Sequence, residues 1–336
     1  MSDVTLGVVV VALAGLANGS FAVPSRWILN WNWQQIWLVY IVASCLILPL
    51  FLSLAISPPI FIILARHPSA TAKVIVLGLG WGLGVLCFGL SLNRVGISIT
   101  NAVVSGLAII VGSAGPLAVG SIHLTKGRLQ PLIVGLLFTL LGIIGCCYAS
   151  ILRDRLRGGL DSTGRQQSAF GMVFAVVSGI LASLLNLAFV AAEPLISAGK
   201  ITGMGAVAQS LTAWVPILFG GFLTNGLNSY YQIQRAEPRI LFKKGNAEAW
   251  ILSMLMGVLW FVAIAAYGAG ALMMGSAGPV YGWAICVGTS ILFSTLWGVA
   301  IGEWRAVPFR ITLFLYSGVL LILASLLFMA KYGAPK

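Results

Sequence analysis

The stretch 249–273 reads AWILSMLMGVLWFVAIAAYGAGALM and contains no charged residue. A helix needs about 20 predominantly apolar residues to cross the hydrocarbon core of a bilayer, so this stretch is long enough to span a membrane. Its internal glycines do not argue against a helix, because glycine is common in transmembrane helices. The stretch therefore predicts a transmembrane helix, and its composition is repeated along the whole chain.

Nine further apolar runs have the same character and predict nine more spans. They fall at 4–26, 35–57, 72–93, 97–122, 130–152, 168–192, 203–224, 279–302 and 310–331. Only 8% of the residues are charged, whereas a soluble domain carries about 25%. The sequence therefore predicts an all-α integral membrane protein of ten transmembrane helices, and it leaves no room for a soluble catalytic or nucleic-acid-binding domain.

The two halves of the chain resemble each other. Trp81 in the third run corresponds to Trp260 in the eighth, and each is followed at equal spacing by an aromatic-Gly pair. The sequence predicts a first five-helix repeat at 1–152, a basic cytoplasmic linker at 153–167 and a second five-helix repeat at 168–336. Because five is odd, the second repeat enters the membrane inverted, which is the architecture of many transporters.

The basic residues predict the orientation of the chain. The odd-numbered loops hold 12 of the 19 lysines and arginines, and the even-numbered loops and the tails hold 7. Basic loops normally face the cytoplasm and the anionic lipid surface. We therefore expect a multi-pass protein of the bacterial inner membrane with both termini outside. The net charge of +12 is explained by contact with membrane lipid, so no nucleic-acid partner is expected.

Signatures of enzymes and metal sites are missing from the sequence. It has no His-Glu-x-x-His, Gly-x-Ser-x-Gly or Walker motif, and its five cysteines lie inside apolar runs without metal-ligand spacing. A membrane-embedded enzyme would need paired carboxylates, a metal cluster or an activated nucleophile. We therefore expect a protein that is not an enzyme, with no catalytic residue, no metal and no cofactor.

Polar side chains inside the spans are the candidates for a binding site, because an unpaired amide in lipid costs on the order of a few kcal/mol. Hydrogen bonds between helices are the alternative explanation for each of them. Amides can pair with hydroxyl groups, and aromatic rings can stack on the C–H face of a sugar. The set predicts a site for a small neutral polyhydroxylated ligand, formed by Asn18, Trp81, Asn101, Asn186, Gln209, Trp260 and Tyr267.

Scattered Gly and Trp positions carry a resemblance to a known family. They are Trp81–Gly84, Phe88–Leu90, Val95–Ser98, Gly171, Ala191–Ala192, Pro194, Gly257, Trp260, Tyr267–Gly268, Trp283 and Gly302–Trp304. In these segments the chain resembles the L-rhamnose/proton symporter family, a branch of the drug/metabolite transporter superfamily. The resemblance implies a ten-helix fold and the uptake of L-rhamnose, or a related deoxysugar, by proton symport with alternating access.

Proton symport calls for a titratable group in or near the pathway. None of the seven acidic residues lies in the middle of a span. The remaining candidates for proton coupling are Glu193, Glu303 and His123, all at span ends, although Glu303 could also be an interfacial carboxylate paired with Arg305. The sequence thus leaves open a sodium symporter, a proton-independent sugar uniporter, or an exporter of amines or other small metabolites.

Overall fold

The structure is a computed structural model that describes residues 3–156, 169–236 and 247–333. These ranges are helical and contain no strand. Ten helical segments in them are long and apolar enough to cross a membrane. Their positions agree with the ten predicted spans to within a few residues at most ends, so the predicted fold class is confirmed. The main exceptions are the sixth span, which extends to Ile201 instead of 192, and the seventh, which extends to Arg235 instead of 224.

The first five spans occupy the chain up to residue 156. They consist of α1 (Asp3–Ser20) with η1 (Val23–Trp27), then α2 (Trp33–Val42) with η2 (Ala43–Ile47) and α3 (Leu48–Ile56), then α5 (Pro68–Val95), α6 (Ile97–Ala118) and α7 (Lys126–Leu156). A short helix, α4 (Ile60–Arg66), lies between the second and third spans. Because α7 continues to Leu156, the first residues of the predicted linker are helical, and 157–167 lie outside the described residues.

The second five spans follow from residue 169. They consist of α8 (Ala169–Ala182), α9 (Leu184–Ala191) and α10 (Glu193–Ile201) in succession, then α11 (Ala206–Ala236), α12 (Ala247–Met273), η3 (Gly275–Ala277) with α13 (Gly278–Ala300), and α14 (Phe309–Gly333). The sixth span is interrupted at Ser183 and again at Ala192, two residues before Pro194. Proline has no N–H and clashes with the preceding turn, so a helix tends to break just before it.

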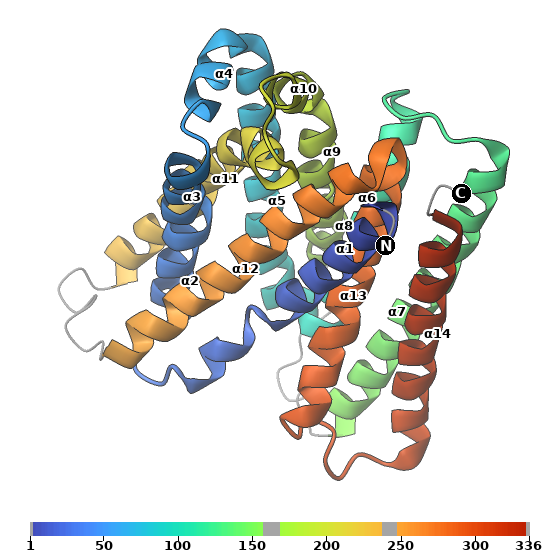
Figure 1. The fold of residues 1–336 in the computed structure, drawn as a ribbon. Coiled ribbons are helices and arrows are strands. Elements are labelled where there is room, and N and C mark those ends of the chain that lie inside the picture. The colour runs from blue at the N-terminus through green and yellow to red at the C-terminus, as the bar shows by residue number, and fades with distance from the viewer. Residues whose placement is uncertain (1–2, 157–168, 237–246, 334–336) are drawn as a thin grey trace.

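The spans alternate in direction, so both termini lie at the same end of the molecule (Figure 1). We call this the terminal end. Helix α7 lies beside α14 along one edge, and α1 packs against α12 and α13. Helix α5 packs against α8 and α11, while α2 packs against α11 and α12. Each of these contacts joins a helix of the first five spans to a helix of the second five.

Glycines allow α5 and α11 to approach closely. A Cβ atom added to Gly78 would lie 2.1 Å from the carbonyl oxygen of Ile217, and one added to Gly220 would lie 2.2 Å from that of Ile75. Small residues let the backbones of membrane helices touch in this way. At Gly89, further along the same helix, an added Cβ would meet no atom within 4 Å.

This contrast gives a first prediction. Gly78→Ala should destabilise the protein by about 1–3 kcal/mol, because the backbones of α5 and α11 must separate to relieve the clash. Gly89→Ala is the matched control and should be neutral or slightly stabilising, since alanine favours a helix over glycine by roughly 0.5–1 kcal/mol. Thermal unfolding in detergent compares the two variants, and equal melting temperatures would contradict the close approach of the helices.

Candidate functional site

Four aromatic side chains form a continuous row between spans. The ring centroids of Phe21 and Tyr40 are 5.3 Å apart, those of Tyr40 and Trp260 are 6.1 Å apart, and those of Trp260 and Trp81 are 5.5 Å apart. The two indoles stack with an interplanar angle of 12°. The structure thus brings together two of the predicted site residues, from α5 and α12. We call Phe21, Tyr40, Trp260 and Trp81 the aromatic row.

Glycines beside the aromatic row make room for its rings. A Cβ atom on Gly221 of α11 would lie 2.3 Å from the ring of Trp81, so a larger residue there would displace the indole. On α12, a Cβ atom on Gly257 would lie 2.7 Å from that of Ala43, which shows how closely α12 approaches the second span beside Tyr40. Small residues in the helices therefore fix the positions of the large ones.

A second group of polar atoms surrounds Asn186. Its Nδ2 donates to the carbonyl oxygens of Gly112, at 2.9 Å, and Pro279, at 2.8 Å, and its Oδ1 accepts a hydrogen bond from the hydroxyl of Tyr267. Asn186 and Tyr267 have no exposed surface. We call these four residues the amide cluster. It joins α6, α9, α12 and α13, as expected of a hydrogen bond between membrane helices.

Asn18 makes a simpler contact. Its Nδ2 donates to the hydroxyl of Ser290 at 3.0 Å, which links α1 to α13. Two turns of α13 further on, the indole N–H of Trp297 donates to the hydroxyl of Ser20 at 2.8 Å. Asn18 and Ser290 are only partly buried. Their polar atoms are thus more accessible to a ligand than those of Asn186.

The other two predicted amides lie apart from these groups. Asn101 is exposed in the second turn of α6. Gln209, near the start of α11, donates its Nε2 hydrogen to the carbonyl oxygen of Met204, five residues earlier. Neither side chain contributes to the aromatic row or to the amide cluster.

The three candidates for proton coupling lie at opposite ends of the molecule. Glu193 is exposed at the start of α10 and accepts a hydrogen bond from Ser197, while His123 is exposed in the connection between α6 and α7. Both segments belong to the terminal end (Figure 1). Glu303, in the connection between α13 and α14, lies at the other end and forms an ion pair with Arg153, with 3.1 Å between Oε2 and Nη1.

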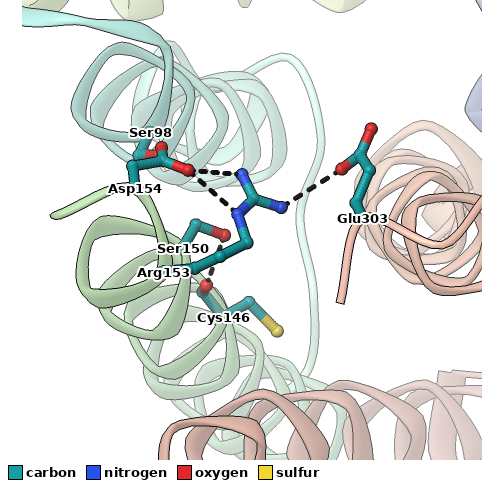
Figure 2. A network of polar contacts seen from close by, with 6 residues as sticks. All are labelled: Ser98, Cys146, Ser150, Arg153, Asp154 and Glu303. Atoms are coloured by element: carbon teal, nitrogen blue, oxygen red, sulfur yellow. Dashed lines mark hydrogen bonds and ion pairs between the residues drawn. The ribbon is translucent and has the colours of Figure 1, made fainter. Parts of the chain in front are cut away.

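Arg153 also contacts a second carboxylate, that of Asp154, through Nε at 2.9 Å and Nη2 at 2.8 Å (Figure 2). The hydroxyl of Ser98 donates to the other oxygen of Asp154 at 3.0 Å. We call Ser98, Arg153, Asp154 and Glu303 the Arg153 network. Within the described ranges, no group of three or more His, Cys, Asp or Glu side chains could hold a metal ion.

Several of these contacts were not predicted from the sequence. Arg153 and Asp154 are the first two residues of the expected basic cytoplasmic linker, which predicted no contact between them and Glu303. Tyr40 and Ser290 stand within apolar runs and have no recurrent spacing that would single them out. Asp154 is the sequence feature that could have pointed to the Arg153 network, since it is the acidic residue closest to the end of the fifth apolar run.

Comparison with known proteins gives one family. The family described as L-rhamnose-proton symport protein (RhaT) matches residues 1–331. A curated L-rhamnose-proton symporter of Pectobacterium atrosepticum is 24% identical over 341 residues, which covers 96% of this chain and 97% of that protein. One from Yersinia pestis (strain Pestoides F) is 24% identical over 336 residues and covers 95% of each chain.

Proposed function

The chain belongs to the L-rhamnose-proton symport protein family, and from this membership we propose that it imports L-rhamnose across the bacterial inner membrane together with protons. The match over residues 1–331 is the observation that carries the proposal, because it includes all ten spans. The family is one of transporters, so the protein is not an enzyme. A related deoxysugar is the alternative substrate, and competition of unlabelled deoxysugars with labelled L-rhamnose for uptake would identify it.

The sugar site in this proposal lies beside the aromatic row, where Trp81 and Trp260, which stack on each other in this structure, would separate to offer ring faces to the C–H groups of the sugar. Asn18 and Ser290, which are accessible, bind its hydroxyl groups. The polar side-chain atoms of Asn186 and Tyr267 are already engaged in hydrogen bonds with each other and with backbone carbonyl groups. In this proposal they hold the helices around the site in place and do not bind the sugar. Asn101 and Gln209 would join the site only after a rearrangement of α6 and α11.

Alternating access in this proposal uses two inverted five-helix repeats, 1–152 and 168–336. The pattern of helix packing supports it. Helix α5, the third span, packs against α8, the sixth, and α12, the eighth, packs against α1, the first. Advancing each span of the first pair by five positions in the cyclic order of the ten spans gives the second pair, so the two contacts are equivalent in the two repeats. Halves that repeat each other in this way can rock around a site at their interface.

The proposed orientation places both termini outside and the Arg153 network at the cytoplasmic end. The distribution of basic residues supports it, since 12 of the 19 lysines and arginines fall in the odd-numbered loops. Among the described residues, Arg94, Arg155 and Arg305 lie near this end, on the connections opposite the termini. Protons entering with the sugar would meet Glu193 and His123 first and Glu303 last.

Uptake of labelled L-rhamnose into proteoliposomes tests the function. With one proton per sugar, an inward gradient of one pH unit should drive accumulation to about tenfold, because a pH unit and a tenfold concentration ratio both correspond to about 1.4 kcal/mol. A protonophore should abolish the accumulation, and liposomes without protein supply the background. Saturable uptake that ignores the gradient would indicate a uniporter, and no uptake in either condition would refute the assignment of rhamnose.

A further inference from the structure

The Arg153 network connects parts of the chain that are far apart in sequence. Arg153 and Asp154 lie in the last turn of α7, Ser98 lies in the first turn of α6, and Glu303 lies in the connection that follows α13. The guanidinium of Arg153 also lies over the ring of Trp304, 4.9 Å from its centroid. Arg153 and Asp154 together therefore join the ends of α6 and α7 to the connection that follows α13 (Figure 2).

The charges in the network do not balance. An arginine side chain stays protonated in proteins, so the network holds one fixed positive charge and two carboxylates. Arg153 contacts Asp154 through two nitrogen atoms and Glu303 through one, and the side chain of Glu303 is 45% exposed against 23% for Asp154. Glu303 is therefore the more exposed of the two carboxylates and makes the single contact with the guanidinium.

Other charged groups near Glu303 are few among the described residues. Arg305 lies in the same connection, against Gly302, and Arg155 and Arg310 are exposed at the adjoining ends of α7 and α14. Arg94, at the end of α5, donates to the carbonyl oxygen of Leu90 and lies over Phe174. The carboxylates that face Arg153 are thus Asp154 and Glu303.

The backbone around Glu303 is held in an uncommon conformation. Gly302 has φ 86°, which is favourable only for glycine, and Ala306 has φ 61°, which is rare for a residue with a side chain. Strained backbone of this kind persists only where the surrounding contacts enforce it. The turn from 302 to 306 therefore presents Glu303 and Trp304 to Arg153.

The helix ends next to the network are loosely packed. On α13 the buried residues all lie between Gly278 and Leu292, and none follows up to Ala300. On α6, Thr100 is buried and hydrogen-bonded to Ser91, but residues 101–105 are not buried, whereas six of the residues from 106 to 116 are. With little apolar burial at these ends, polar contacts carry a larger share of their attachment: those of Arg153 and, on α13, also the hydrogen bond from Trp297 to Ser20 of α1.

From this geometry we propose that Arg153 is a positioning residue for proton coupling. It holds Glu303 against α7, and binding of one proton by Glu303 breaks this contact and releases the end of α13 that lies opposite the termini. The proposal rests on the proposed proton symport and names the element through which the proton acts. Asp154 remains paired with Arg153 and Ser98 throughout and keeps the guanidinium in place.

Glu303→Gln imitates the protonated state and tests the proposal in proteoliposomes. This variant should lose the about tenfold accumulation driven by one pH unit, yet exchange labelled for unlabelled rhamnose at equal pH. Arg153→Gln should behave alike, while Arg155→Gln, two residues further along α7 and exposed, should accumulate rhamnose like the unchanged protein. Full accumulation by Glu303→Gln would overturn the proposal, whereas failure of exchange in the unchanged protein would refute the rhamnose function instead.

A distance measurement tests the release independently of the substrate. Spin labels at Arg155→Cys and Ala300→Cys, both exposed positions, would be placed in a chain whose five native cysteines are replaced by alanine. Lowering the pH should lengthen or broaden the label distance, and Glu303→Gln should show the low-pH distribution at every pH. A distribution that does not depend on pH in the unchanged protein would overturn the proposal even if rhamnose is not the substrate.

Discussion

Asn186→Ala is expected to be the most damaging replacement in the interior. The side chain holds two backbone carbonyl groups and the hydroxyl of Tyr267, and it has no exposed surface. A buried polar group left without its partner costs about 1–3 kcal/mol, so the loss should be on the order of 3 kcal/mol or more. The melting temperature in detergent and the yield of monodisperse protein should both fall sharply.

Asn18→Ala is the matched control for this prediction. It removes an amide that is only partly buried and that bonds to a single side-chain hydroxyl, that of Ser290. Hydrogen bonds between membrane helices average about 0.6 kcal/mol, so this variant should melt close to the unchanged protein. Tyr267→Phe should fall between the two. If Asn186→Ala melts like Asn18→Ala, the amide cluster does not hold the helices together and its polar atoms are available to a ligand.

The ten spans could be predicted because hydropathy alone decides them. Backbone groups in lipid must bond within their own segment, which leaves an uninterrupted apolar helix as the only arrangement for runs such as 249–273. The position of the break in the sixth span was less predictable, because Pro194 stands near its end, where a proline could equally mark the start of a loop. The span continues instead through α10 to Ile201.

The candidate site was predictable only in part, because it depends on which helix faces lie together. Trp81 and Trp260 occupy corresponding places in the two halves, and that correspondence predicted two residues that do stack. Asn101 and Gln209 satisfied the same criterion of polarity within a span, yet they lie near helix starts, outside the central contacts. A single sequence does not contain the pairing between distant helices that separates these cases.

The Arg153 network could not be predicted for the same reason, because it depends on which distant segments lie together. Three of its four members are charged residues at span ends, but the sequence placed Arg153 and Asp154 in a basic linker and offered Arg305 as the partner of Glu303. The contact with Glu303 spans 150 positions in the sequence. Only the packing of α7 beside α14 brings the end of α7 to the connection before α14.

Trp260→Ala is expected to abolish rhamnose transport. The indole lies between Trp81 and Tyr40 in the aromatic row, with only 6% of its surface exposed. Removing a buried tryptophan leaves a cavity and costs about 3–5 kcal/mol, so stability must be measured together with transport. Trp260→Phe separates the two effects, since it keeps an aromatic ring and most of the apolar volume.

For Trp260→Phe we expect a folded protein that exchanges rhamnose with an apparent affinity about threefold to tenfold weaker, because aromatic contacts of this kind contribute roughly 0.5–1.5 kcal/mol. The same two replacements at Trp250 are the control. Trp250 lies on the same helix but is 37% exposed and contacts Trp31 rather than the aromatic row. Rhamnose exchange with unchanged affinity in a well-folded Trp260→Ala would remove the aromatic row from the sugar site, because no ring face would then be needed for binding.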